Sequence, residues 1–163
     1  MPELTSLAES VGALLKERGE KIAVADSSAG GLISAALLAV PGASAYYLGG
    51  IVSYTGVSRL ALLGISEDDM ARAGMRASTE PYAALIASTL REKMGATWAL
   101  AETGASGPTG NRYGDAAGHA CFAVSGPVER AVTLETGHGD REANMWAFAR
   151  RALELLEECV RAA

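Results

Sequence analysis

The stretch Ala25-Asp26-Ser27-Ser28-Ala29-Gly30-Gly31 decides the expected fold. The apolar run before it, Ile22–Ala25, is typical of a buried strand, and Leu32–Leu38 after it has the composition of a helix. The stretch is therefore predicted to be a strand-to-helix turn that carries adjacent hydroxyls and adjacent glycines. Backbone N–H groups and the positive end of the helix dipole point into such a turn, which suits an anion or an oxyanion. A serine that only caps the helix explains this stretch equally well.

Composition favours one compact α/β domain over residues 1–163. The chain is 49% apolar and 6% aromatic and has 19 glycines, which suits a sizeable core with close contacts between helices and sheet. Its formal charge is −5 and it has no basic stripe, so nucleic-acid binding by phosphate neutralisation is not expected. The apolar runs are much shorter than a membrane span, so no membrane contact is expected either.

The amino terminus and the cysteines favour a cytoplasmic location. Met1-Pro2-Glu3 does not begin a charged and then apolar leader, so no export signal is expected. Cys121 and Cys159 fall in a predicted strand and in the last predicted helix, which is typical of reduced thiols rather than of a disulfide or a zinc site. No ligands have the spacing of a metal site, and no cofactor is expected.

Helices and strands are predicted to alternate along the chain, with a hairpin near its end. Helices are expected over 4–15, 32–40, 57–63, near 66–69, over 79–94 and after Asp140. Strands are expected over 21–25, 46–54, 97–101, 119–124 and 130–134. This order predicts a three-layer α/β/α sandwich with a mixed central sheet.

A second loop that combines hydroxyls with glycines follows the third predicted strand, over residues 102–110. Ligands of open α/β sheets bind at the carboxyl ends of strands, especially where two such loops meet. The pattern therefore predicts a site for a small anionic ligand, although tight turns filled with small residues are the alternative. Neither loop is a Walker or a dinucleotide motif. The expected binding residues are Asp26, Ser28, Gly30, Gly31, Thr103, Gly104, Ser106 and Gly107.

Few residues are available for catalysis at this edge of the sheet. Tyr54 ends the second predicted strand and Arg59 follows in a helix, where an ordinary strand-end aromatic and a surface arginine are the simpler interpretations. Ser27 needs a base to act as a nucleophile, and no lysine clearly reaches it. His119 is expected within a strand, as a satisfied core group, and His138 in a loop. The sequence contains neither an evident Ser-His-Asp triad nor a G-x-S-x-G motif.

Several stretches together resemble the C-terminal domain of the competence/damage-inducible protein CinA. Residues 25–33 (ADSSAGGLI) resemble the family's A-E-S-[CS]-T-G-G, residues 40–47 (VPGASAYY) its P-G-[SA]-S-A, and residues 50–54 (GIVSY) its G-x-V-[ST]-Y. Residues 103–108 (TGASGP) resemble T-G-I-A-G-P, and Gly139-Asp140-Arg141 is a further match. The resemblance covers nearly the whole chain in order. Through the family's stand-alone members it implies a nicotinamide-nucleotide amidase, which hydrolyses nicotinamide mononucleotide to nicotinate mononucleotide and ammonia.

The resemblance also implies roles for individual residues. It places the family's proposed nucleophile on Ser27, its site tyrosine on Tyr54, its loop threonine on Thr103 and its lysine on Arg59. The last position departs from the family, because a desolvated lysine can act as a base whereas arginine keeps its proton. Tyr54 or Asp26 would then take over proton transfer, while N–H groups of residues 28–31 hold the oxyanion.

Two functions therefore remain open at this point. In the first, the chain is a diverged amidase that acts on a nucleotide with Ser27, Tyr54 and Arg59 as its catalytic residues. In the second, it is a non-catalytic relative that binds a nucleotide or a partner, since the family's lysine is Arg59 here. The resemblance further implies a homodimer or a higher homo-oligomer.

Overall fold

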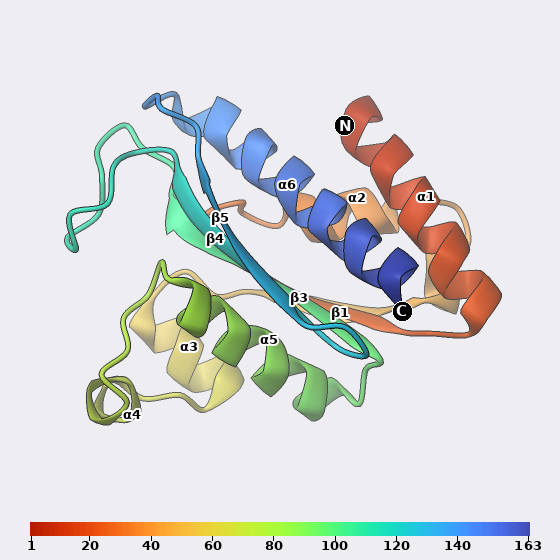
Figure 1. Ribbon diagram of the computed structural model, residues 1–163, viewed down its shortest axis with the longest axis horizontal. Helices are drawn as coiled ribbons and strands as arrows, with labels where there is room; N and C mark the ends of the chain where they lie inside the picture. The colour runs from red at the N-terminus through yellow and green to blue at the C-terminus, as the bar shows by residue number, and fades with distance from the viewer.

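The computed structural model describes residues 1–163 and contains one five-stranded mixed sheet between two layers of helices (Figure 1). Its strands are β1 (Ile22–Asp26), β2 (Tyr47–Val52), β3 (Trp98–Ala105), β4 (His119–Ser125) and β5 (Arg130–Glu135). The strand order is β2-β1-β3-β4-β5. β1 pairs in parallel with β2 and β3, whereas β3, β4 and β5 pair antiparallel. The predicted three-layer sandwich with a mixed sheet is confirmed.

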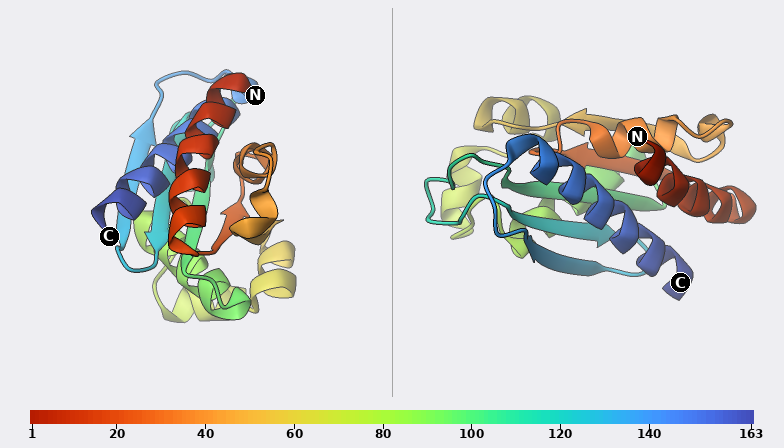
Figure 2. Two further views of the ribbon diagram at one scale, coloured as in Figure 1. Left: turned by 90° about the vertical axis from the view of Figure 1, so that its right-hand side faces the viewer. Right: turned by 90° about the horizontal axis from the view of Figure 1, so that it is seen from above.

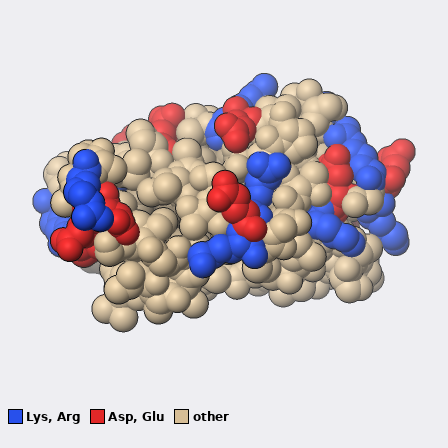
Figure 3. Space-filling model, turned by 90° about the horizontal axis from the view of Figure 1, so that it is seen from below, with Lys and Arg blue, Asp and Glu red and all other residues tan.

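Helices cover both faces of the sheet (Figures 1 and 2). On one face lie α1 (Pro2–Arg18), α2 (Leu32–Leu38) and α6 (Arg141–Ala162). On the other lie α3 (Gly56–Leu63), α4 (Glu67–Arg72) and α5 (Glu80–Met94), where acidic and basic side chains occur in small mixed groups (Figure 3). A short 3-10 helix, η1 (Ala43–Ala45), precedes β2. No helix is both long enough and apolar enough to cross a membrane.

Capping residues in the sequence determine most helix ends. Side chains of Thr55, Ser66, Thr79 and Asp140 each accept a hydrogen bond from a backbone N–H in the first turn of the helix that follows. Glycines with left-handed backbone end three of the helices, because only glycine adopts this conformation without a steric penalty. These glycines are Gly19 after α1, Gly64 after α3 and Gly95 after α5.

β3 differs most from its predicted extent. The strand continues to Ala105, through residues expected in a loop, because Glu102–Ala105 stay paired with His119–Phe122 of β4. Gly104 permits this close pairing, since a Cβ there would lie 2.5 Å from the carbonyl oxygen of His119. Two smaller differences concern α2, which ends at Leu38, and β2, which is shorter than the predicted 46–54.

Each face of the sheet has its own apolar core. The cluster under α1, α2 and α6 has 25 buried residues and includes the large side chains of Trp98, Phe122 and Phe148. The cluster under α5 has 15, and the strand residues that it includes are mostly alanines, such as Ala99 and Ala101. Small side chains on this face let α5 lie close to the sheet.

We expect Phe148→Ala to lower the free energy of unfolding by about 3–5 kcal/mol. Phe148 is fully buried, and its ring meets that of Phe122 edge-on with the centroids 6.3 Å apart. Val57 is 80% exposed, so Val57→Ala should change stability by less than about 0.5 kcal/mol. Urea unfolding of both variants checks this, and equal losses would contradict the packing role of Phe148.

Candidate functional site

Two adjoining cavities lie at the carboxyl ends of β1 and β3, beside the loop over residues 106–118 that projects beyond the sheet (Figure 1). The larger, here the Ser27 cavity, has a volume of about 400 Å³. The smaller, here the Ser28 cavity, has a volume of about 240 Å³. Tyr54, Gly104 and Asn111 line both cavities, so the two form one cleft.

The Ser27 cavity brings together the residues expected to be catalytic. Its wall contains Ser27 and Tyr54, which follow β1 and β2, Arg59 of α3 and Thr103 of β3. Thr103 is buried, and its hydroxyl accepts a hydrogen bond of 3.1 Å from the backbone N–H of Ser78. The remaining lining residues are Ser53, Thr55, Gly56, Glu67, Ala77, Ser78, Tyr82, Gly104, Asn111, Arg112 and Tyr113.

Arg59 is a buried cation and not the surface arginine that its position in a short helix suggested. Its side chain is only 7% exposed, and its Nη2 donates to Oε1 of Glu67 at 2.7 Å. Its Nε donates to the carbonyl of Ile65, and the guanidinium lies 6.0 Å from the ring centroid of Tyr82. These contacts fix the guanidinium in the wall, where it can attract an anion but cannot accept a proton.

The Ser28 cavity contains the expected residues Ser28, Gly104, Ser106 and Gly107, together with Ala105, Thr109, Gly110 and Arg141. Arg141 donates to the carbonyl of Gly107 at 2.5 Å and to the hydroxyl of Tyr54 at 3.1 Å. The hydroxyl of Ser106 is buried and has no hydrogen-bond partner within the protein. A ligand in this cavity would meet one guanidinium and several hydroxyls.

Glu102 supports the turn beside the candidate site and was not identified from the sequence. Its carboxyl group is fully buried, and Oε2 accepts the backbone N–H groups of Ser27 at 2.9 Å and of Ala29 at 2.8 Å. Oε1 accepts the hydroxyl of Ser28. Burial raises the pKa of Glu102 to about 7, although these hydrogen bonds act in the opposite direction. An acid directly after the apolar run Trp98–Ala101 was the signal that could have identified it.

Three expected binding residues lie outside the cleft walls. The carboxyl group of Asp26 is fully buried and accepts hydrogen bonds from the backbone of Ile33 and Ser34, so it caps α2. Burial also raises the pKa of Asp26. Gly30 and Gly31 adopt positive φ angles of 66° and 93° that shape the turn, and neither lines a cavity.

The donors of the opening turn are already partly used. Glu102 accepts the N–H of Ala29, and the N–H of Gly30 donates to the carbonyl of Ser27. The expected oxyanion site therefore loses two of its donors. The alternative in which a serine caps the helix is also wrong, because the N-cap of α2 is Gly31 and Glu102 accepts the Ser28 hydroxyl.

His119 belongs to a network that holds the projecting loop. As expected, it lies within a strand and both ring nitrogens have partners, Glu135 at Nδ1 and the carbonyl of Ser78 at Nε2. Burial lowers the pKa of His119, but the hydrogen bonds to these partners outweigh burial and leave the pKa raised. Asp115 lies 3.7 Å from His119 of β4 and pairs at 2.7 Å with Arg76, which lies between α4 and α5, so it connects the loop to both parts of the fold.

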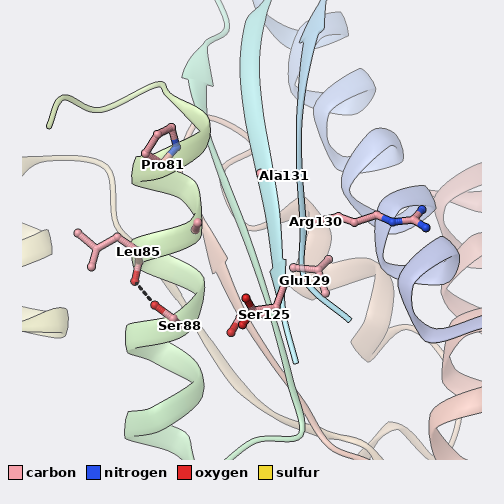
Figure 4. A pocket seen from close by; sticks show the side chains of 9 residues that line it. Pro81, Leu85, Ser88, Ser125, Glu129, Arg130 and Ala131 are labelled. Carbon is pink, nitrogen blue, oxygen red and sulfur yellow. Dashed lines mark hydrogen bonds between the residues drawn. The ribbon is translucent and has the colours of Figure 1, made fainter. Parts of the chain in front are cut away.

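A third cavity, of about 430 Å³, lies between α5 and the β4–β5 hairpin (Figure 4). Arg130 points away from it toward α6, and Ser88 donates to the carbonyl of Leu85. Ser125 has a buried hydroxyl without a partner there. None of the predicted site residues lines this cavity, so the cleft at β1 and β3 is the candidate functional site.

Together, the fold and the cleft define a three-layer α/β domain whose candidate site lies at strand ends that contain hydroxyl groups and glycines. The chain belongs to the CinA C-terminal domain family, which it matches over residues 4–160. It is 42% identical over 122 residues to a CinA-like protein of Prochlorococcus marinus, covering 75% of this chain and 28% of that protein. It is 36% identical over 154 residues to a CinA-like protein of Chlorobium limicola, covering 91% and 35%. The chain thus spans about a third of the length of these relatives.

Solved structures of the same superfamily have this fold. A CinA superfamily protein of Klebsiella pneumoniae superposes with a TM-score of 0.90 at 26% identity, covering 98% of this chain and 99% of that one. A competence/damage-inducible protein of Agrobacterium tumefaciens gives a TM-score of 0.84 at 26% identity, covering 96% and 94%. Neither name states a reaction or a ligand.

We expect the free energy of unfolding to fall less with rising pH in Glu102→Gln than in the parent protein. The unfolded Glu102 ionises near pH 4.5 and the folded one near 7, so between these values the native state holds the extra proton. Rising pH therefore lowers the free energy of unfolding through this group, by up to about 3 kcal/mol.

Urea unfolding at pH 5 and pH 8 measures this difference. Glu129→Gln is the matched control, because Glu129 is exposed and its replacement should leave the pH dependence as in the parent. An identical pH dependence of stability in the parent and Glu102→Gln would contradict the burial of an ionisable Glu102.

Proposed function

We propose that the cleft hydrolyses the carboxamide of a nicotinamide nucleotide, with Ser27 as the nucleophile. The observation that carries the proposal is the position of Ser27, Tyr54, Arg59 and Thr103 in the wall of one cavity. The oxygen of Ser27 would attack the carboxamide carbon, and ammonia would leave with the proton that serine gives up. Water would then hydrolyse the acyl ester to release nicotinate nucleotide and restore the serine.

The lining of the Ser27 cavity suits a nucleotide of this kind. Tyr54 is exposed in the cavity wall and offers an aromatic surface for a cationic pyridinium ring, whereas guanidinium groups already lie over Tyr82 and Tyr113. Arg59 and Arg112 supply positive charge for the phosphate in the same cavity. Arg141 adds a further guanidinium in the adjoining cavity. Ring, amide and phosphate would therefore each have a complementary group within the cleft.

Proton transfer requires a group other than Arg59. Asp26 is turned toward α2 and does not line the cleft, so it is not a proton acceptor for Ser27. Tyr54 lines both cavities, and its hydroxyl accepts a hydrogen bond from Arg141. Tyr54 is therefore the proton acceptor that this proposal uses.

A second candidate function is nucleotide binding without turnover. The observation that favours it is the ion pair between Arg59 and Glu67, which occupies the wall position where a base would be needed. Such a relative would bind a nicotinamide nucleotide with saturation and release no ammonia.

We expect the protein to release ammonia from nicotinamide mononucleotide, and Ser27→Ala to lower the rate about 10³-fold or more. Without the Ser27 hydroxyl there is no nucleophile, while the cavity walls remain. Ammonia is measured by a coupled assay, and nucleotide binding is measured on both proteins. Saturable binding with no ammonia above the Ser27→Ala background would favour the non-catalytic alternative.

We expect Arg59→Lys to raise amide hydrolysis at alkaline pH, because a buried lysine can lose its proton and act as a base. Glu67 holds a lysine in its charged form, so the increase should be larger in Arg59→Lys combined with Glu67→Gln. Arg72→Lys is the control, since its exposed ion pair with Asp69 lies outside the cavity. Rates that stay at the parent level in both Arg59 variants would show that position 59 does not limit the reaction.

A further inference from the structure

We infer that Glu102 fixes the direction of the Ser28 hydroxyl, so that Ser28 presents only lone pairs to a ligand and selects a carboxamide over a carboxylate. The inference rests on the proposed amide substrate and names the group that would recognise its –NH2. It concerns specificity and not the attack by Ser27.

The contacts of Glu102 determine which way the Ser28 hydrogen points. The backbone N–H groups of Ser27 and Ala29 can only donate, and both donate to Oε2. An ionised carboxylate has no hydrogen of its own, so Oε1 accepts from Ser28. A hydroxyl carries one hydrogen, and this bond uses it. The lone pairs of Ser28 remain for the cavity that it lines.

A carboxamide matches this arrangement and a carboxylate does not. The –NH2 of the amide can donate to Ser28, while its carbonyl can accept from the unpartnered hydroxyl of Ser106 in the same cavity. A carboxylate has no hydrogen to give, and it would bring a second negative charge near the buried Glu102. The cleft would therefore favour substrate over product and assist the release of the acid.

Protonation of Glu102 would reverse the direction of its hydrogen bond with Ser28. A protonated carboxyl donates to Ser28, whose own hydrogen is then free to point into the cavity toward an acceptor. The surroundings bring this change close to neutral pH, since burial raises the pKa of Glu102 to about 7. Asp26 on β1 is the charged neighbour and raises it further, whereas the turn over residues 27–29 supplies neutral donors and Phe122 on β4 is apolar.

Glu102→Gln tests the inference without removing the side chain. Its amide oxygen can accept the two backbone N–H groups, and its –NH2 donates to Ser28, which fixes the reversed polarity at every pH. The measurement is the ratio of dissociation constants for nicotinate and nicotinamide mononucleotides, in a Ser27→Ala background that prevents turnover. We expect at least a tenfold preference for the amide with Glu102 at pH 8, and a tenfold or greater loss of that preference in Glu102→Gln.

Two controls separate hydrogen-bond polarity from charge and from structure. Glu129→Gln removes an exposed carboxylate outside the cleft and should leave the ratio unchanged. The second control is a double-mutant cycle with Ser28→Ala. Without the Ser28 hydroxyl, Glu102→Gln should change the ratio only through the loss of negative charge, so its effect should be smaller than in the presence of Ser28. If Glu102→Gln does not fold, the parent's ratio should still fall as pH drops from 8 to 5.5. The phosphate group titrates in both nucleotides, so its effect on the ratio of dissociation constants largely cancels.

The outcomes distinguish this inference from the proposed function. An unchanged ratio in Glu102→Gln, or a ratio independent of pH in the parent, overturns the role of Glu102. If ammonia is released but the ratio does not change, the amidase proposal stands and this inference fails. If the ratio changes as expected and no ammonia is released, the role of Glu102 in ligand selection stands and the amidase proposal fails. Absence of binding of both nucleotides, and of free nicotinamide and nicotinate, overturns both.

Discussion

The parallel pairing of β1 with β3 is the constraint on which the cleft depends. It sets Ala25 beside Ala101, so the residues that follow, Asp26 and Glu102, lie at the same level of the sheet. Successive side chains of a strand point to opposite faces. Asp26 and Glu102 therefore lie on the α2 side, while Ser27 and Thr103 reach the cavity on the α5 side. One register thus places the buried acids on one face of the sheet and the hydroxyls that line the cavity on the other.

Much of the fold follows from local sequence signals. Caps such as Thr79 and Asp140 and glycines such as Gly95 identify helix ends, and the apolar runs identify the strands. The extent of β3 could not be predicted in the same way. Its last residues have the small polar composition of a loop, and only the pairing of Gly104 with β4 keeps them extended. Nonlocal pairing here outweighs local composition.

The location of the candidate site was predictable from the sequence, but its internal contacts were not. Two hydroxyl-containing strand ends indicated the sheet edge, and the structure does bring Ser27 and Thr103 to one cavity. The side chain of Glu102 reaches from β3 into the turn after β1, which is a contact between two different strands. The ion pair of Arg59 with Glu67 likewise joins two helices. Patterns along the chain do not contain such contacts, so a free oxyanion turn and a surface arginine were the natural expectations.

The network around His119 has a consequence for the energetics of binding. Asp115 and Asn111 are hydrogen-bonded to one another at 2.8 Å, and Arg76 and His119 tie them to the rest of the molecule. Asn111, Arg112 and Tyr113, which line the cleft, are therefore ordered before any ligand arrives. Binding therefore does not have to offset the free-energy cost of ordering this loop, which is about 1–2 kcal/mol for the backbone of each residue. More of the interaction energy with a small molecule then remains as affinity.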